Sequence, residues 1–154
     1  MAVVAPFCQY KKTNFKIYIG LLLIFAAYFA YDGYYNKNFA SKHTSLEGKQ
    51  DPTLVFNRKS PPYLLAAAVA VAIYAGLLWG KKIIADDQQL ILSEKEKISY
   101  RSIESINKTD YDSKGYFVVV YKDSTGQMLQ KKISNRTFDN LDAVLQLLVS
   151  KITG

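Results

Sequence analysis

The sequence predicts a membrane protein with a two-helix transmembrane hairpin in its N-terminal half, followed by a small α+β domain. Two stretches, at about 15–35 and 60–80, are apolar and almost free of charge, whereas charged residues crowd into the rest of the chain. After residue 80 the pattern changes to short alternating runs and ends on an amphipathic helix, which is typical of a sheet covered by a helix. We therefore expect 1–80 to hold the N-terminal segment, both spans and a polar loop, and 81–154 to form a soluble domain.

The first span is predicted from Phe15 to about Tyr35. Its charge-free centre, Ile17 to Tyr31, covers fifteen residues, or roughly 22 Å of helix, and is shorter than a ~30 Å hydrocarbon core. Lys16 can extend to the head groups at one end and tyrosines gather at the other, so the flanks supply the missing length. Because bulky aromatic residues follow the apolar run, we expect no signal-peptidase cleavage there.

The second span, 60–80, contains twenty-one residues without a charge, or about 31 Å of helix. Pro61 and Pro62 are predicted to lie in its first turn, where a missing N–H has no helical partner. Small residues fill its middle, and such residues let helix backbones approach closely in lipid. Three of them recur at i, i+4 and i+8, and these are the candidates for helix packing: Ala68, Ala72 and Gly76.

Two explanations for this small-residue stripe remain open. The stripe can pack against the first span, through Gly20 and Ala27, because a two-helix hairpin needs such a contact. Alternatively, a partner subunit can use the stripe or the opposite face, which bears Ala70, Tyr74 and Leu77.

Basic residues flank both spans. Residues 1–80 carry eight Lys/Arg and three Asp/Glu, against twelve and ten in 81–154, so most of the net charge of +7 belongs to the membrane half. A nucleic-acid-binding protein would concentrate its cations on the folded domain, so we expect no nucleic acid as a partner. Five lysines at the span ends are candidates for contact with anionic lipids: Lys11, Lys12, Lys16, Lys81 and Lys82. Five Lys/Arg in the intervening loop balance them, so charge alone does not fix the orientation.

Short strands are predicted after residue 82. Tyr116 to Tyr121 gives the strongest signal, because every residue there is aromatic or β-branched. A turn at 123–126 then leads into a second strand at 127–133. Weaker runs precede this hairpin, at 83–85, 90–92, 98–100 and 103–106. These runs predict a small sheet of short strands.

A helix is predicted at the C-terminus. Thr137 is a suitable N-cap, and Asp139 would lie in the first turn, where a negative charge is favourable. Five apolar residues recur at spacings of three and four: Phe138, Leu141, Leu145, Leu148 and Ile152. The opposite face is not basic, so we expect this stripe to pack on the sheet and not on a membrane surface.

Four segments carry a resemblance to a known family. They are the run Lys81-Lys82-Ile83-Ile84-Ala85, the segment Ile98-Ser99-Tyr100-Arg101-Ser102-Ile103-Glu104-Ser105-Ile106, the valine-rich strand with its hairpin, and the helix that opens Phe138-Asp139-Asn140-Leu141. Over about residues 81–152 this order resembles small bacterial membrane proteins with a PH-like (bacterial pleckstrin-homology-like) domain. The resemblance implies a PH-like sheet or open barrel with a C-terminal helix. It also implies a multi-pass protein of the bacterial inner membrane with both termini in the cytoplasm.

The resemblance also indicates where a lipid head group would bind. Eukaryotic PH domains bind phosphoinositides through basic residues around a strand-connecting loop. The nearest residues of this kind are Lys95, Lys97 and Arg101, or Lys131, Lys132 and Arg136. Acidic residues interrupt the first group and the end of a strand divides the second, so protein contact through a sheet edge or the helix is favoured.

The sequence contains no enzyme signature: we find no P-loop, nucleophile elbow, zinc-binding helix or paired-cysteine motif. Cys8 and His43 lie in separate segments and provide neither a metal cluster nor a catalytic pair. Both are interpreted as surface or loop residues. We therefore expect no catalytic residue, metal or cofactor.

These observations favour a non-catalytic accessory or scaffolding subunit of a larger membrane protein complex. Membrane lipids and other membrane protein subunits are the expected partners. The alternative is a membrane-tethered sensor or adaptor whose PH-like domain binds lipid head groups or a peptide.

Overall fold

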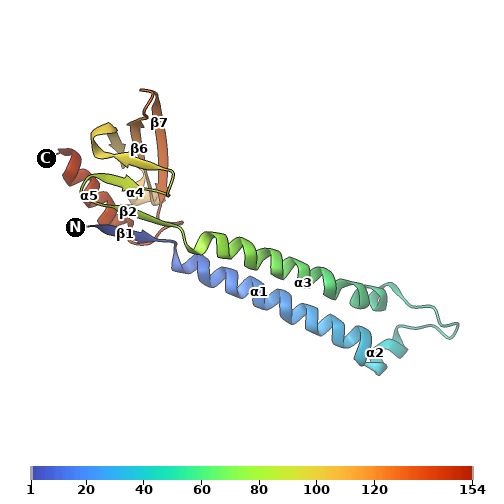
Figure 1. The fold of residues 1–154 in the computed structure, drawn as a ribbon. Helices are drawn as coiled ribbons and strands as arrows, with labels where there is room; N and C mark the ends of the chain where they lie inside the picture. Colours follow the sequence, from blue (N-terminus) through green and yellow to red (C-terminus); the bar gives the residue numbers. More distant parts are fainter. Residues whose placement is uncertain (1, 154) are drawn as a thin grey trace. The chain divides into compact units, whose positions relative to one another are not determined.

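The computed structural model describes residues 2–153, which divide into two units. Unit 1 contains the residues up to Lys12 together with those from Leu78 onward, and unit 2 contains Thr13–Leu77. Figure 1 follows the elements along the chain by colour.

Unit 1 contains two antiparallel sheets, one of four strands and one of three. The four-stranded sheet has the order β1 (Val3–Pro6), β2 (Lys82–Ala85), β3 (Gln89–Ile91) and β4 (Lys97–Ser99). The three-stranded sheet has the order β5 (Ile103–Asn107), β6 (Tyr116–Lys122) and β7 (Met128–Ser134). A short helix, α4 (Tyr111–Lys114), precedes β6, and α5 (Leu141–Thr153) follows β7. The predicted α+β composition of this region is therefore confirmed.

Strand β1 was not expected. It pairs with β2 along its whole length, with Val3 opposite Ala85 and Pro6 opposite Lys82, and Ala5 is fully buried. The N-terminal strand and the strand after the second long helix are therefore neighbours in one sheet. The expected boundary at residue 81 leaves this strand out of the domain to which it contributes core.

The C-terminal helix begins later than expected. It starts at Leu141, and Thr137 is not its N-cap. Asn140 adopts a φ of 60°, a left-handed conformation that a helix does not continue through. The apolar stripe itself is confirmed, since Leu141, Leu145 and Leu148 are all buried.

Both sheets and α5 contribute to the core of unit 1. Its fully buried larger side chains are Ile83, Leu90 and Ile98 from the first sheet, Phe117 and Val119 from the second, and Leu141, Val144 and Leu148 from α5. The alternation of buried and exposed residues along β6 explains why its sequence reads so clearly as a strand.

Unit 2 is a pair of antiparallel helices joined by a structured connector. Helix α1 (Gln9–Ala30) continues into a π-helical turn, η1 (Tyr31–Tyr35), a short helix α2 (Lys37–Lys42) follows, and α3 (Pro52–Trp79) returns. The two long helices run side by side in Figure 1, and ring contacts join Phe15 to Tyr74 (5.9 Å) and Phe29 to Phe56 (5.3 Å). The runs Gln9–Tyr35 and Pro52–Trp79, of 27 and 28 residues, are each long and apolar enough to cross a membrane.

Helix α3 begins eight residues before the predicted start of the second span. The Asp51 carboxylate accepts a hydrogen bond from the Leu54 N–H (2.9 Å), which makes Asp51 the N-cap and Pro52 the first helical residue. Pro61 and Pro62 therefore lie inside the helix, and the prediction that they open it is wrong. Pro52 is the proline at the first helical position, where a missing N–H has no helical partner.

Candidate functional site

The contact between α1 and α3 follows spacings of three and four residues, the pattern of two helices that cross at a shallow angle. On α3 the buried small residues Ala68 and Ala75 stand seven residues apart, with the half-buried Val71 between them. On α1 the buried residue is Ala26. The half-buried residues that continue the pattern on α1 are Phe15, Ile19, Leu22 and Phe29.

Only one of the three predicted packing candidates lies in this contact. Ala68 is buried, whereas Ala72 and Gly76 are exposed. A Cβ atom added at Gly76 would meet no atom within 4 Å. The explanation that the whole stripe packs on the first span is therefore wrong, and α1 contributes Ala26 instead of Ala27. Within the described part of the chain, the face that carries Ala72 and Gly76 is left uncovered.

The two prolines inside α3 leave two carbonyl groups without their usual helical donors. A proline at position i cannot donate to the carbonyl of residue i−4, so Pro61 and Pro62 release the carbonyls of Asn57 and Arg58. The Tyr34 hydroxyl of η1 donates a hydrogen bond to the released Arg58 carbonyl at 2.7 Å. The π-helical turn thus supplies a donor that the helix itself has lost.

Gly33 lets η1 and α3 approach closely at this place. A Cβ at this position would lie 2.9 Å from the Asn57 carbonyl oxygen and 3.1 Å from Cγ of Arg58. Arg58 Nε also donates to the Gly33 carbonyl at 2.7 Å. Any side chain larger than a hydrogen atom at Gly33 would therefore separate the two backbones.

Buried polar residues gather in the same part of unit 2. Asp32, Asn57 and Ser60 are all at least nine-tenths buried. The Asp32 carboxylate accepts a hydrogen bond from the Asn36 side chain (2.8 Å), and among the described residues the Ser60 hydroxyl has no hydrogen-bond partner. These three buried polar residues, beside the two prolines, interrupt the otherwise apolar contact between the helices.

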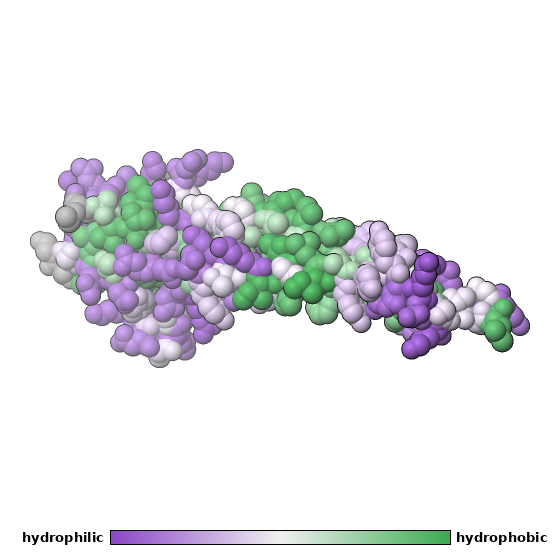
Figure 2. Space-filling model, turned by 90° about the horizontal axis from the view of Figure 1, so that it is seen from below, coloured by the Kyte–Doolittle hydropathy of each residue, from purple (hydrophilic) through white to green (hydrophobic). Residues whose placement is uncertain are grey.

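The apolar surface of the two long helices is mostly uncovered. In the most apolar window of each helix, only 6% and 11% of the residues are buried. Figure 2 shows hydrophobic residues gathered around the middle of the helix pair and hydrophilic residues toward the end that carries the connector. The uncovered side chains include Leu21, Ile24, Phe25, Leu65, Val69, Ile73 and Leu77. A core helix of a soluble protein would have such side chains buried.

Four of the five predicted lipid-contacting lysines belong to unit 1, and Lys16 belongs to unit 2. Lys81 and Lys82 are exposed at the start of β2. The Phe7 N–H donates to the Lys81 carbonyl at 3.0 Å, so the N-terminal segment runs beside these two lysines. Lys11 and Lys12 follow in the first turns of α1 and are half-buried.

The segment between β7 and α5 holds the N-terminal segment in place. The Asp139 carboxylate accepts a hydrogen bond from the Gln9 N–H (2.8 Å) at the start of α1, and the Asp139 N–H donates to the Pro6 carbonyl (2.9 Å). The Thr137 carbonyl accepts from the Cys8 N–H (2.9 Å). Cys8 lies in the short segment between β1 and α1, as the interpretation as a loop residue expects, but it is buried and not at the surface.

A pocket of about 250 Å³ opens beside β7 in unit 1. Its apolar lining comes from Ile83, Leu92, Ile133 and Phe138, and its polar lining from Lys81, Ser93, Glu96, Lys131 and Lys132. The Lys131 ammonium contacts both Glu96 carboxylate oxygens at 2.7 Å, and this ion pair joins β7 to the turn between β3 and β4. The Lys132 ammonium lies 3.6 Å from the centre of the Tyr116 ring.

The other basic residues that the PH resemblance singled out lie elsewhere. Lys95, Lys97 and Arg136 are exposed. Arg101 lines a separate pocket of about 450 Å³ together with Tyr100 and Lys151.

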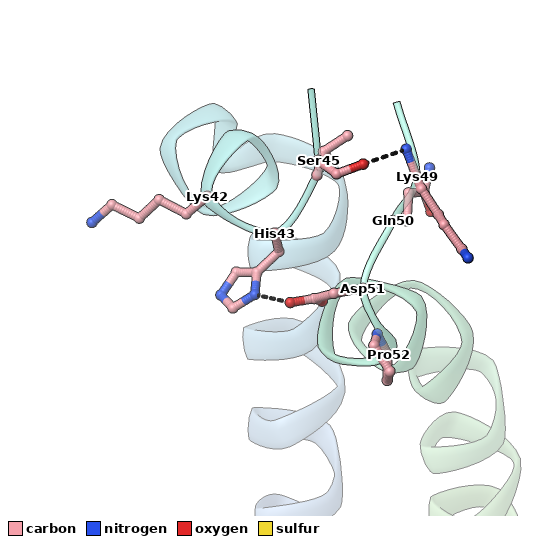
Figure 3. A pocket seen from close by; sticks show the side chains of 8 residues that line it. Lys42, His43, Ser45, Lys49, Gln50, Asp51 and Pro52 are labelled. Atoms are coloured by element: carbon pink, nitrogen blue, oxygen red, sulfur yellow. Dashed lines mark hydrogen bonds and ion pairs between the residues drawn. The ribbon is translucent and has the colours of Figure 1, made fainter. Parts of the chain in front are cut away.

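In the connector of unit 2, His43 and Asp51 are joined by both a side-chain contact and a backbone hydrogen bond. His43 Nδ1 lies 2.6 Å from Asp51 Oδ2, and the Asp51 N–H donates to the His43 carbonyl at 3.0 Å. The pKa of Asp51 lies below its ordinary value. The hydrogen bond with His43 is the largest cause of this shift, and the hydrogen bond from the Leu54 N–H is the second. Figure 3 shows that Lys42 and Lys49, which line the adjacent pocket, extend to opposite sides of it. Their charges therefore do not converge on one ligand.

Comparisons with known proteins give no match: no protein-family model matches the chain, and neither a curated protein nor a solved structure does. Its function is therefore inferred from its own residues and their geometry.

Proposed function

We propose that this chain is a non-catalytic accessory or scaffolding subunit of a membrane protein complex, anchored by α1 and α3. The observation that carries the proposal is the uncovered apolar surface of these two helices. In water such a surface would cost a large hydration free energy, since each large apolar side chain gains about 1.5–3 kcal/mol on burial. Lipid removes that cost without any further protein contact.

The β1–β2 pairing supports a hairpin topology with both ends on one side of the membrane. β1 precedes α1 and β2 follows α3, and the two strands form one ladder. Two spans that start and finish in the same sheet must leave and return through the same membrane face. This argument does not depend on the loop charges, which are balanced.

We place this face in the cytoplasm of a bacterium and regard unit 1 as PH-like. Two antiparallel sheets of four and three strands with a C-terminal helix support that proposal, together with the sequence resemblance over 81–152. No residue of unit 1 is assigned a catalytic role.

Orientation is tested with single cysteines in a background where Cys8 is replaced by serine. Leu46, fully exposed in the connector, and Ser124, exposed in the β6–β7 turn, are the two reporter positions. An impermeant maleimide added to intact cells should label Leu46→Cys and leave Ser124→Cys unmodified. The reverse result would contradict the cytoplasmic orientation, and labelling of both would contradict the hairpin.

A partner helix would be received by the uncovered face at Ala72 and Gly76. Ala72→Leu adds bulk to this face without touching the contact with α1, because Ala72 is exposed. If the accessory-subunit proposal is right and the partner uses this face, Ala72→Leu should lower the native-gel mass of the extracted assembly. A loss with Ala70→Leu and not with Ala72→Leu would instead place the partner on the opposite face. Wild-type migration near the monomer mass would instead support the adaptor alternative. The pocket beside β7 is the observation that favours that alternative.

A further inference from the structure

The pocket beside β7 combines an apolar floor with an excess of positive charge. Ile83 and Ile133 are almost fully buried and form its base, and Leu92 and Phe138 are half-buried at its walls. A volume of about 250 Å³ would hold roughly eight water molecules at ~30 Å³ each. That is enough for a head group and the first methylene groups of a chain, and too little for a folded segment.

The charges around the pocket are not balanced. Three lysines and one carboxylate line it, and the carboxylate of Glu96 is already paired with Lys131. Lys132 is directed onto the Tyr116 ring. Lys81 is exposed, and among the ion pairs of the described residues it has no carboxylate partner. An incoming anion would therefore meet Lys81 first.

The position of Lys81 in the chain indicates the source of that anion. Trp79 is the last residue of α3, so Lys81 follows it by two residues, a distance of at most about 7 Å between Cα atoms. If α3 crosses a membrane, Lys81 lies at the level of the lipid head groups.

We propose that this pocket binds the head group of an anionic phospholipid. Lys81 provides the main cation for the phosphate, and the floor of Ile83 and Ile133 receives the glycerol and the first methylene groups. The proposal rests on the membrane anchoring proposed above and deepens its adaptor alternative, since the domain would then respond to the lipid composition of its own membrane.

The pocket favours a lipid over an acidic peptide for two reasons. A peptide added along β7 would need a row of side-chain sites, whereas the pocket has one cation in front of one apolar floor. In addition, the apolar floor of Ile83 and Ile133 offers no hydrogen-bond partner to the polar backbone of a peptide. A phospholipid presents one anion with apolar groups directly attached to it.

Native mass spectrometry of the full-length protein in a mild detergent tests the proposal, with dioleoyl phosphatidylglycerol or dioleoyl phosphatidylcholine added. We expect the wild type to retain one phosphatidylglycerol more strongly than phosphatidylcholine. Lys81→Gln should weaken that retention by about tenfold, the loss of one charge-assisted hydrogen bond. The matched control is Lys108→Gln, which removes the same charge from an exposed lysine of unit 1 outside the pocket lining. It should change retention less than about threefold.

A third variant has an effect of opposite sign. Glu96→Gln removes the carboxylate that occupies Lys131, so it should strengthen phosphatidylglycerol retention. Equal losses in Lys81→Gln and Lys108→Gln would overturn the proposal, because they would show general attraction to a basic protein. Complete displacement by inorganic phosphate, or by a glutamate-rich peptide whose binding depends on Lys81, would also overturn it.

Failure of the anchoring is recognised separately by alkaline carbonate extraction of membranes. If the wild type stays in the membrane pellet but retains no phosphatidylglycerol, the pocket proposal fails and the anchoring stands. Release of the wild type into the supernatant contradicts the anchoring, and the pocket proposal fails with it.

Discussion

Replacement of Gly33 by alanine should push η1 and α3 apart at the place where they approach closely. The new Cβ would lie 2.9 Å from the Asn57 carbonyl oxygen and 3.0 Å from its carbon, both backbone atoms that cannot rotate away. Ordinary contact begins near 3.4 Å, so the backbone of α3 must retreat by about half an ångström. The same movement stretches the hydrogen bonds from Arg58 Nε to the Gly33 carbonyl and from Tyr34 to the Arg58 carbonyl, both 2.7 Å long.

The expected cost follows from these contacts. Overpacking of a close contact costs roughly 1–3 kcal/mol, and a weakened hydrogen bond adds a fraction of the ~0.5–1.5 kcal/mol that an intact one contributes. We therefore expect Gly33→Ala to destabilise the helix pair by about 1–3 kcal/mol. Gly20→Ala is the matched control, because a Cβ there meets no atom within 4 Å. That change should be neutral or stabilising by up to about 1 kcal/mol, since alanine has the higher helix propensity.

The assay is unfolding of the full-length protein in mixed micelles with an increasing mole fraction of dodecyl sulfate, followed by far-ultraviolet circular dichroism. The transition of Gly33→Ala should move to less dodecyl sulfate than that of the wild type, and the transition of Gly20→Ala should not. If the two variants unfold together, η1 and α3 do not approach as closely as the structure places them, and the reasoning from the released carbonyls fails with it.

Three further predictions concern the domain, its link to α1 and the connector. Leu145→Ala should destabilise the full-length protein by about 2–5 kcal/mol, because Leu145 is buried, whereas Gln146→Ala, at an exposed position, should leave its melting temperature nearly unchanged. Asp139→Ala removes the carboxylate that accepts from the Gln9 N–H, and should cost about 0.5–2 kcal/mol in the same melting experiment; an unchanged melting temperature would contradict its capping role. The lowered pKa of Asp51 means that its ionised form is stabilised by folding, so this contribution is present above the ordinary pKa of 3.8 and is lost as the pH falls through the lower folded-state pKa. Amide hydrogen exchange in the connector should therefore accelerate in acid for the wild type, and an Asp51→Asn variant should show no such acid-induced change beyond the intrinsic rate.

Elements with a strong local pattern could be predicted from the sequence. The two long apolar helices follow from continuous runs without charge, and β6 follows from the β-branched and aromatic residues between Tyr116 and Tyr121. In each case the pattern arises because neighbouring residues share the same environment, either one buried face or a segment removed from water. Such a pattern can therefore be seen in any short stretch of the sequence. The stripe on α5 was predictable for the same reason, although its first residue was not.

Non-local pairing explains what was missed. Strand β1 has only four residues, and its partner β2 begins at Lys82, so no short window contains both strands. The late start of α5 has the same origin, because Asp139 bonds to Pro6 and Gln9, residues that lie more than 100 positions away. The local signal of Thr137 and Asp139 favours an N-terminus of α5, and the tertiary contact overrides it.

The small-residue stripe was misassigned because of a difference in helical period. Residues at i, i+4 and i+8 drift around a straight helix, whereas a pair of helices at a shallow crossing angle keeps contact through alternating steps of three and four. Ala68 and Ala75, seven residues apart, satisfy the second rule, and Gly76, eight residues after Ala68, does not. Both Val71 and Ala72 fit between Ala68 and Ala75 by spacing, but Val71 is half-buried and Ala72 is exposed. The sequence contained both patterns, and only the position of the partner helix chooses between them.

The link between the helices and the domain has a consequence for the order of folding. Ala5 is part of the unit 1 core, yet it precedes α1, while β2 follows α3. If both long helices cross a membrane as proposed, the four-stranded sheet is complete only when both have been made and the ends that carry β1 and β2 are on the same side of it. Until then the hydrogen-bonding edge of β2 is open and the core of unit 1 lacks Ala5. In that case a chain that inserted only one of the two helices would hold β1 and β2 on opposite faces and could not form this core, so the β1–β2 pairing is compatible with the proposed two-span topology and not with a single span.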